Sequence, residues 1–172
     1  MRFVFLTLLT TAFIFSKSQL FFMPYEQVAG ISALKNALAS ARHQIEISIY
    51  SFTNKEIAKV LRDRARSGVK IYIIYDEESN IKNHYSTIGY LASLKNIQVC
   101  VLRGRPSKHN YHGIMHQKLA IIDHQMVLFG SANWSKNAFE NNYEILFQTD
   151  DKEVVSKAVD GFKMMLKECR SY

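Results

Sequence analysis

The stretch MHQKLAIIDHQMVLFGSANWS, residues 115–135, decides this fold and also suggests a functional site. Two apolar runs, KLAII and MVLFG, flank the residues DHQ, a pattern typical of a β-hairpin. Residues two apart on a strand point to the same side, so His116 and Lys118 are expected to project together where the first strand begins. Ser131 and Asn133 are expected to do the same where the second strand ends. The hairpin predicts that these two ends lie side by side.

The polar groups at these ends suit the binding of an anion. The ammonium, hydroxyl and carboxamide groups can each donate a hydrogen bond, and a phosphodiester is an occupant that fits them. Gly130, directly before Ser131, lets a neighbouring backbone approach closely. Taken singly, each residue has an ordinary structural explanation, since Asp123 favours a turn and Asn133 could cap a helix. The spacing of the whole set is what indicates a site.

The pattern His-x-Lys-x4-Asp-x6-Gly-Ser-x-Asn is complete from His116 to Asn133, and here the sequence resembles the phospholipase D superfamily, which carries the HKD motif. At roughly one in twenty per residue type, a chance match at all the fixed positions is on the order of one in tens of millions per starting point. The motif occurs once in the chain. Within the superfamily, the short chain, single motif and export signal are most similar to the small bacterial endonucleases of the Nuc type.

The resemblance implies a phosphodiesterase mechanism that needs no metal or other cofactor. His116 would be the nucleophile that forms a phosphohistidine, while a second histidine protonates the leaving alkoxide and then activates water. Lys118 and Asn133 would hold the non-bridging oxygens, and Ser131 would add a hydrogen bond. Because the motif occurs once, the resemblance implies a homodimer whose two-fold axis brings together His116 from each subunit.

Two acidic residues enter the candidate site through the same resemblance. Asp123 belongs to it as a structural or supporting residue rather than a chemically active one. Glu144 stands where the Nuc-type enzymes carry a glutamate that orients the nucleophilic histidine through its other nitrogen. Glu140 is the alternative for that role.

The loop before the motif, residues 103–112, mixes basic and aromatic side chains. This mixture suits a nucleic-acid groove, through phosphate contacts and base stacking. The candidate substrate-binding residues are Arg103, Arg105, Lys108 and Tyr111. The expected substrate is DNA, with RNA left open. Single strands are expected to be preferred, because a groove narrow enough for two opposed histidines admits one backbone more readily than a duplex.

The rest of the chain alternates strand and helix patterns, which predicts an α/β fold. The expected architecture is a mixed, mostly parallel sheet flanked by helices on both faces, with one HKD motif per chain. Strands are expected at residues 44–52, 69–76, 97–103, 118–122, 126–130 and 142–148. Helices are expected at residues 28–42, 55–66, 86–95 and 154–166.

The first residues have the layout of a secretory signal. Arg2 precedes an apolar run from Phe3 to Phe15, and small residues stand before a cleavage site after Ser18. This run is too short to cross a hydrocarbon core of ~30 Å, but an uncleaved segment from Phe3 to Met23 would serve as an inner-membrane anchor. The chain therefore divides into residues 1–18, a signal peptide or anchor, and residues 19–172, a single nuclease domain. We expect export, to the periplasm or to the outer side of the membrane.

The net charge agrees with a nucleic-acid substrate, and the cysteine content agrees with export. The chain of 172 residues carries a formal charge of +7, which favours nucleic acid or an anionic membrane surface as partner. An exported chain can keep disulfides. Cys100 and Cys169 either form one or remain two thiols.

Three other functions stay open at this stage. A phospholipase acting on anionic lipids such as cardiolipin would have the same motif, although the neighbouring loop is basic and no apolar entrance segment is evident. A metal-dependent hydrolase would use His109, His112 and His116, but no matching outer shell of residues is evident. A non-catalytic DNA-binding protein of the envelope would need the basic charge alone.

Overall fold

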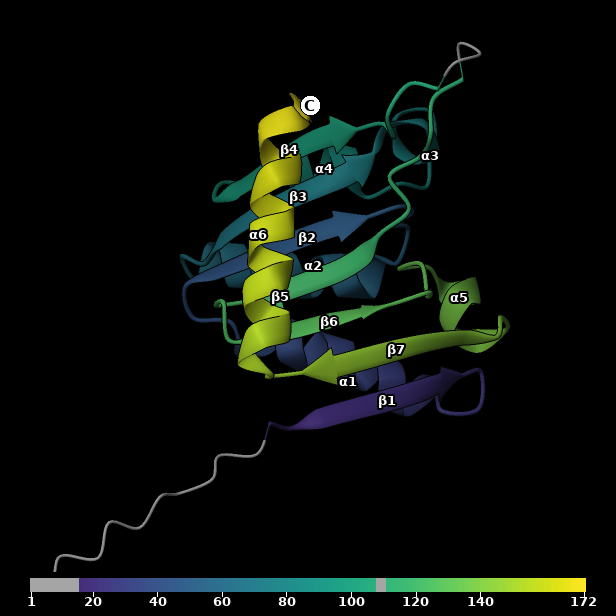
Figure 1. The fold of residues 1–172 in the computed structure, drawn as a ribbon, viewed down its shortest axis with the longest axis vertical. Helices are drawn as coiled ribbons and strands as arrows, with labels where there is room; N and C mark the ends of the chain where they lie inside the picture. The colour runs from purple at the N-terminus through teal and green to yellow at the C-terminus, as the bar shows by residue number, and fades with distance from the viewer. Residues whose placement is uncertain (1–15, 108–110) are drawn as a thin grey trace, which may run out of the picture.

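The computed structural model describes residues 16–107 and 111–172, which form one eight-stranded sheet with helices on both faces (Figure 1). The strands are β1 (Ser18–Met23), β2 (Gln44–Ile49), β3 (Lys70–Asp76), β4 (Ile97–Leu102), β5 (Lys118–Ile122), β6 (Met126–Gly130), β7 (Glu144–Thr149) and β8 (Arg170–Ser171). The helices are α1 (Gln27–Ser40), α2 (Lys55–Arg66), α3 (Glu77–Ile81), α4 (Ile88–Ala92), α5 (Lys136–Glu140) and α6 (Lys152–Glu168).

The sheet is mixed, with the strand order β1-β7-β6-β5-β2-β3-β4-β8. The predicted α/β class is confirmed, but the expectation of a mostly parallel sheet is wrong. Among the described strands, β3 pairs in parallel with β2 and with β4, and every other neighbouring pair is antiparallel. The connections explain the difference. Helical crossovers join β2 to β3 and β3 to β4, whereas a tight turn joins β5 to β6, and such a turn permits antiparallel pairing alone.

Alternating side chains divide the core into two layers. Ile73 of β3 packs in the layer that contains Leu38 of α1 and Leu61 of α2. Ile74, the next residue, packs in the layer that contains Phe162 of α6. Figure 1 shows α6 crossing one face of the sheet, with α1 and α2 behind it. The predicted covering of both faces is therefore confirmed.

The β5–β6 hairpin forms as the sequence predicts. Asp123 and His124 have positive φ angles of 50° and 54°, and the N–H of Gln125 donates to the carbonyl of Ile122 at 2.9 Å. Two successive positive φ values match the twist of a hairpin, and Asp tolerates this region better than most residues. The local residue types thus explain the turn.

Strand β1 was not predicted. It pairs antiparallel with β7 along its whole length, and its last residue, Met23, is buried in the core. Residues 18–23 therefore belong to the sheet and not to a continuous anchor from Phe3 to Met23, while a signal peptide or anchor over residues 1–18 stays a prediction. The apolar run from Phe3 to Phe15 lies outside the described residues. None of the helices within the described ranges combines the length and the apolar character needed to span a bilayer.

The two cysteines form a disulfide. The Sγ atoms of Cys100 in β4 and Cys169 after α6 are 2.08 Å apart, which decides between the two alternatives left open by the sequence. The bond joins the end of α6 to the sheet, where β8 adds a short antiparallel strand beside β4. The C-terminal helix is therefore held covalently against the face that it covers.

Candidate active site

The motif residues gather at one edge of the sheet. The parallel strands β2, β3 and β4 end at this edge, and β5 begins there because it is antiparallel to β2, with Lys118 opposite Ile49. By the same antiparallel pairing, β6 ends there and β7 begins there. Ligand sites of open α/β sheets commonly lie at the carboxyl ends of parallel strands. The expected meeting of the two hairpin ends is confirmed.

His116 lies exposed against the ring of Tyr50. The two ring centroids are 4.5 Å apart in an edge-on arrangement. Tyr50 directly follows β2, and its N–H donates to the carbonyl of Gln117 at 2.9 Å. This bond extends the β2–β5 pairing to the residue next to His116. The histidine is thus presented to solvent from a firmly paired backbone.

Lys118 is buried beside the histidine. Its side chain is 6% exposed, its Nζ donates to the carbonyl oxygen of His116 at 2.9 Å, and it lies 5.0 Å from the centre of the Tyr50 ring. Burial lowers the pKa of the Lys118 ammonium, while the nearby carboxylates of Glu144 and Asp76 oppose that shift. A buried cation held at a fixed point is suited to binding an anion.

Ser131 is fixed to β7 by two hydrogen bonds. Its N–H donates to the carbonyl of Ile145 at 3.1 Å, and its Oγ accepts from the N–H of Ile145 at 3.1 Å. A Cβ at Gly130 would lie 2.1 Å from the carbonyl oxygen of Ile145, so this close approach requires glycine. The predicted role of Gly130 is confirmed. The hydroxyl proton of Ser131 is not used in these contacts.

Asn133 carries a buried side-chain oxygen, Oδ1, without a hydrogen-bond partner among the described residues. Few buried polar atoms in native proteins lack a hydrogen-bond partner. The next residue, Trp134, donates its N–H to the carbonyl of Ser51 at 3.0 Å and anchors this segment to the loop after β2. Helix α5 is capped by Ser135, so the alternative of a capping role for Asn133 is wrong.

Glu144 begins β7 at the same edge. Its carboxylate accepts a hydrogen bond from the Asn142 amide at 3.4 Å and lies close enough to Lys118 to affect its pKa. Among the described residues, no hydrogen bond joins Glu144 to His116, so the orienting contact is not made within one chain and stays a prediction. Glu140, the alternative, pairs with Lys136 at 3.6 Å.

Asp123 lies at the opposite end of β5 from Lys118, about 17 Å away for five residues of extended strand. Its carboxylate accepts the backbone N–H groups of Arg42, His43 and Gln44, each at 2.8 Å. It therefore fixes the α1–β2 connection to the hairpin turn. These contacts agree with the structural role expected of Asp123, and strand length separates it from His116.

Two residues at the edge were missed by sequence reasoning. One is Tyr50, which contacts both His116 and Lys118. The other is Asp76, which is buried at the end of β3 and accepts a hydrogen bond from the N–H of Met115 at 3.0 Å. A sequence signal existed for both, since each is a polar residue at the carboxyl end of a predicted parallel strand.

The basic loop contributes less than expected to the edge. Arg103 pairs with Glu77 at 3.1 Å, and Arg105 pairs with Glu168 at 3.6 Å, so both guanidinium groups contact carboxylates of their own chain. Tyr111 is exposed, and Lys108 lies outside the described residues. The substrate-binding role of this loop stays a prediction.

The histidines proposed for a metal site are described in part. His109 lies outside the described ranges. Within those ranges, no group of three or more His, Cys, Asp or Glu side chains is arranged to hold a metal ion.

Comparison with known proteins adds a family and several relatives. Residues 34–166 match the family model described as "Cardiolipin synthase, PLD-like domain". The mouse mitochondrial cardiolipin hydrolase is 28% identical over 149 residues, which is 85% of this chain. This chain spans 62% of the length of that curated relative.

Two solved structures resemble the whole described fold. NucT from Helicobacter pylori is 50% identical, with a TM-score of 0.90 over 91% of this chain and 99% of that one. A phospholipase D family member, Nuc from Salmonella typhimurium, is 24% identical, with a TM-score of 0.75 over 91% of this chain and 98% of that one. The second likeness concerns the fold, and it confirms the architecture that the motif implies.

Proposed function

This chain belongs to the phospholipase D superfamily, and we propose that it is an endonuclease that hydrolyses phosphodiester bonds of DNA without a metal ion. The observation that carries the proposal is the contact of His116 and Lys118 with the same Tyr50 ring, at the edge where Ser131 and Asn133 also lie. An exposed imidazole beside a buried ammonium supplies a nucleophile next to a fixed anion-binding group.

In the proposed mechanism, a neutral ring nitrogen of His116 attacks phosphorus. The N–P bond forms as the P–O bond to the leaving oxygen breaks, and a second histidine gives that oxygen a proton. The same histidine then takes a proton from water, whose oxygen attacks the phosphohistidine and releases His116. Lys118 and Asn133 hold the non-bridging oxygens as charge develops, and the Ser131 hydroxyl donates a further hydrogen bond.

The second histidine is proposed to be His116 of a partner subunit. The motif occurs once, and isologous pairing about a two-fold axis is the commonest form of oligomer. Exposure of His116 suits an active site completed across such an interface. Glu144, which makes no hydrogen bond to His116 within the described part of one chain, is proposed to orient the histidine only in the assembled dimer.

Charge supports nucleic acid as the substrate. A net charge of +7 favours a polyanion, and single-stranded DNA is the proposed form, with RNA as a further substrate. The disulfide between Cys100 and Cys169 supports the proposal of an exported enzyme, periplasmic or anchored to the membrane, because such bonds persist in oxidising compartments.

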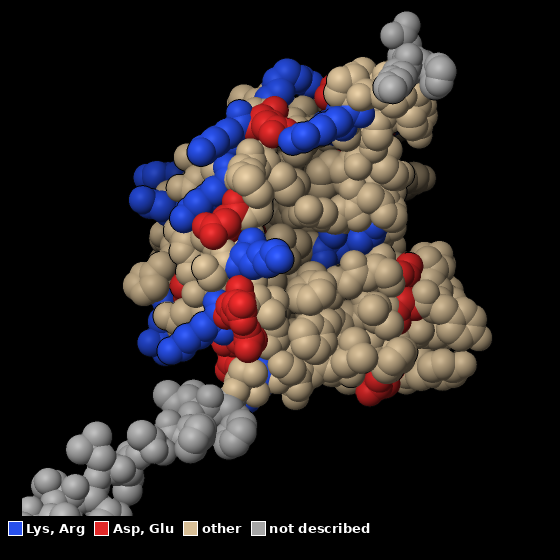
Figure 2. Space-filling view, in the orientation of Figure 1, with Lys and Arg blue, Asp and Glu red and all other residues tan. Residues whose placement is uncertain are grey.

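Hydrolysis of an anionic phospholipid such as cardiolipin is the second candidate. An apolar hollow of about 410 Å³ lies beside Lys118, where no apolar entrance was expected from the sequence. Leu20 and Phe22 of β1 are also exposed, and Figure 2 shows few charged side chains over β1, β6 and β7. The curated relatives named as cardiolipin hydrolases favour the same candidate.

The test offers both substrates to the purified full chain in excess chelator. Single-stranded DNA, duplex DNA and cardiolipin vesicles are presented in parallel, with His116→Ala as the matched variant. DNA cleavage that disappears in the variant supports the nuclease. Cleavage of lipid without cleavage of DNA would replace it with the second candidate. DNA binding without turnover in the parent protein would indicate a non-catalytic binding protein.

A further inference from the structure

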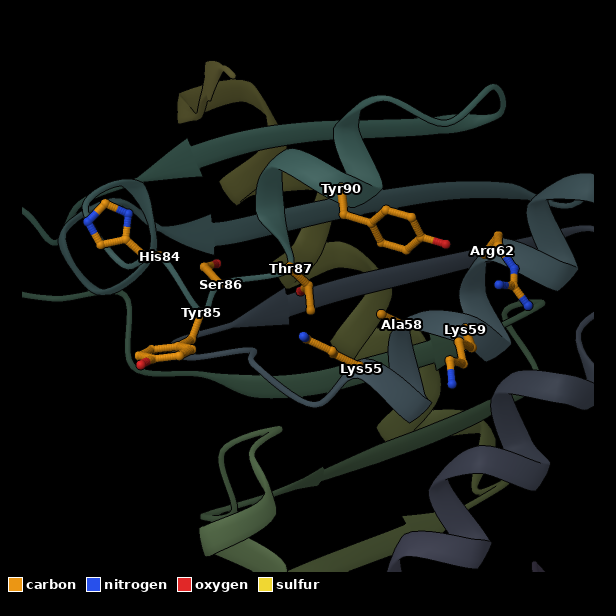
Figure 3. Close-up of a pocket in the computed structure, with 9 residues that line it drawn as sticks. All are labelled: Lys55, Ala58, Lys59, Arg62, His84, Tyr85, Ser86, Thr87 and Tyr90. Carbon is orange, nitrogen blue, oxygen red and sulfur yellow. The ribbon is translucent and has the colours of Figure 1, made fainter.

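A groove of about 310 Å³ lies between α2 and the segment that leads into α4, on the face of the sheet opposite α6 (Figure 3). Lys55, Lys59 and Arg62 line it from α2. Tyr85 lines it from the segment before α4 and Tyr90 from α4 itself, and the Tyr90 hydroxyl points toward Arg62. None of these residues belongs to the motif or to the basic loop before it.

The cations of the groove are available to an external anion. Lys59 pairs with Glu56 at 2.8 Å on the helix surface, and the half-buried Arg62 pairs with Asp63 at 2.8 Å. Exposed ion pairs contribute little stability, so another anion can compete for Lys59. Within the described part of the chain, Lys55 forms no ion pair. The groove therefore carries positive charge that its own chain holds only loosely.

The aromatic residues of the groove are unusually open to solvent. The Tyr85 side chain is 79% exposed and that of Tyr90 is 45% exposed. Exposed aromatic faces next to cations are the combination by which proteins bind single-stranded nucleic acid: the cations follow the phosphates and the rings stack on bases. A lipid chain would need aliphatic walls, and Ala58 is the one aliphatic side chain that lines this groove.

The groove is connected to the candidate active site through one buried side chain. Ser86, which lines the groove, donates its hydroxyl to Oδ1 of Asn80 at 2.9 Å. The amide of Asn80 donates to the carbonyl of Tyr50 at 2.7 Å. The Tyr50 ring in turn contacts His116. Two hydrogen bonds therefore link the groove to Tyr50, which places the groove near the catalytic edge.

We propose that the α2–α4 groove binds the single-stranded nucleic acid that extends beyond the scissile phosphate. Lys55 and Lys59 contact backbone phosphates, and Tyr85 stacks on a base. This inference rests on the proposed function and deepens it, because it gives the enzyme a preference for unpaired strands long enough to fill the groove. A duplex keeps its bases stacked on one another and offers none to Tyr85.

The test compares a long substrate with a short one. The full chain hydrolyses oligodeoxythymidylate, which fills the groove, and bis(p-nitrophenyl) phosphate, which occupies the catalytic edge alone. For Tyr85→Ala we expect the KM for the oligonucleotide to rise about 5- to 150-fold, the range of one lost base stack, with Tyr85→Phe close to the parent. For Lys55→Ala/Lys59→Ala we expect the slope of log affinity against log salt to fall by about 1.4, at about 0.7 per lost phosphate contact. Turnover of bis(p-nitrophenyl) phosphate stays unchanged in each variant.

Lys70→Ala/Lys152→Ala is the matched control. Both lysines are exposed at the edge of the sheet opposite the motif, so the same loss of charge should leave KM and salt slope unchanged. An unchanged KM for the oligonucleotide in the groove variants, with cleavage intact, would overturn the groove and leave the function standing. An equal rise in the control would show that only net charge matters, which also overturns it.

Fluorescence anisotropy of labelled oligonucleotide separates the two proposals. If the parent protein turns over neither substrate, the proposed function fails, and the groove is then judged by binding alone. Weaker oligonucleotide binding in the groove variants supports the groove in that case. Variants that keep oligonucleotide binding but lose binding to phosphatidylglycerol vesicles would instead assign the groove to a lipid surface.

Discussion

The Oδ2 atom of Asp76 accepts a hydrogen bond from the backbone N–H of Met115 at 3.0 Å. Met115 directly precedes His116, so a carboxylate at the end of β3 fixes the start of the motif across the intervening strand β2. The other oxygen, Oδ1, accepts the N–H of Ser79 at 2.9 Å and caps α3. Asp76 is 1% exposed, so both contacts are shielded from water. We infer that Asp76 is a positioning residue.

Asp76→Ala removes both contacts at once. We expect the free energy of unfolding to fall by about 1–3 kcal/mol, because the N–H of Met115 stays buried without an acceptor. We also expect kcat to fall by up to about 10²-fold through misplacement of His116, with KM little changed, since Asp76 does not contact substrate. Steady-state kinetics below the unfolding transition measure both parameters.

Asp76→Asn is the conservative variant for this position. Its amide oxygen can still accept one N–H, so it should recover much of the lost kcat. If kcat in the alanine variant equals that of the parent at a temperature where both are folded, Asp76 is only structural.

Lys118→Met should separate stability from activity. Burial lowers the pKa of Lys118, so the folded protein holds this proton less tightly than the unfolded chain. The charged lysine therefore costs stability at pH 7, and that cost disappears as the pH rises through the lowered pKa toward the ordinary value of 10.5. Methionine fills similar volume without charge, so we expect a higher unfolding temperature at pH 7 and a cleavage rate reduced at least about 10²-fold.

Unfolding temperatures measured at several pH values check the sign of this effect on stability. The difference in unfolding temperature between Lys118→Met and the parent should shrink from pH 7 to pH 10.5. A variant that is less stable than the parent at pH 7 would contradict the dominance of burial, and would mean that attraction from Glu144 and Asp76 prevails.

The sequence predicted the elements whose pattern is local. The alternation in β2 and β3, the DHQ turn and the amphipathic α6 each follow from residues adjacent in the chain. Which strands pair with one another does not follow from adjacent residues. β1 looks like the continuation of an apolar leader, and it becomes a strand because β7, more than a hundred residues later, offers it a free edge. The antiparallel majority of the sheet likewise depends on long-range pairing.

The candidate site divides in the same way. The hairpin places His116, Lys118 and Ser131 through local spacing, and those placements are confirmed. Asp123 shares the motif but lies a strand length away, because a fixed sequence spacing includes residues at both ends of β5. Asp76 is not part of the motif. It contacts Met115, next to His116, only because β3 runs parallel to β2 and ends at the same edge of the sheet.

Asp123→Ala tests the structural role of that residue. Burial would raise the pKa of its carboxyl, but the N–H groups of Gln44, Arg42 and His43 outweigh burial and lower the pKa. The stability that Asp123 contributes is therefore present above its ordinary pKa near ~3.9 and is lost as the pH falls through the lowered value. We expect Asp123→Ala to lose about 2–3 kcal/mol at pH 7, with kcat unchanged, and to approach the parent in strongly acidic buffer.

Urea unfolding at a series of pH values measures this difference. Asp123→Asn is the matched control, because asparagine tolerates the same positive φ of 50° and keeps one acceptor. A large loss of kcat in a folded Asp123→Ala protein would return the residue to the catalytic site.

Reduction of the disulfide should lower stability without abolishing activity. Cys100 and Cys169 are separated by 69 residues, and closing a loop of that size stabilises a fold by about 4 kcal/mol in the chain-entropy model. We expect Cys100→Ala/Cys169→Ser to unfold at a markedly lower temperature, and the parent in dithiothreitol to match it. Cleavage at low temperature should persist, because neither cysteine contacts the motif. An unfolding temperature insensitive to dithiothreitol would contradict this.

Mixed dimers test whether two subunits share one active site. When His116→Ala is co-refolded with an equal amount of parent chain, random isologous pairing leaves about a quarter of the dimers with two intact histidines. If both histidines are needed, activity falls to about a quarter of that of an equal total amount of protein made of parent chains alone, and it varies as the square of the parent fraction. Independent active sites would instead give half the activity and a linear dependence. His112→Ala, mixed in the same way, is the control, since His112 lies in the loop before the motif and is not assigned to catalysis. Its activity should equal that of the parent at every mixing ratio, and a linear fall with the fraction of variant would assign the role of the second histidine to His112.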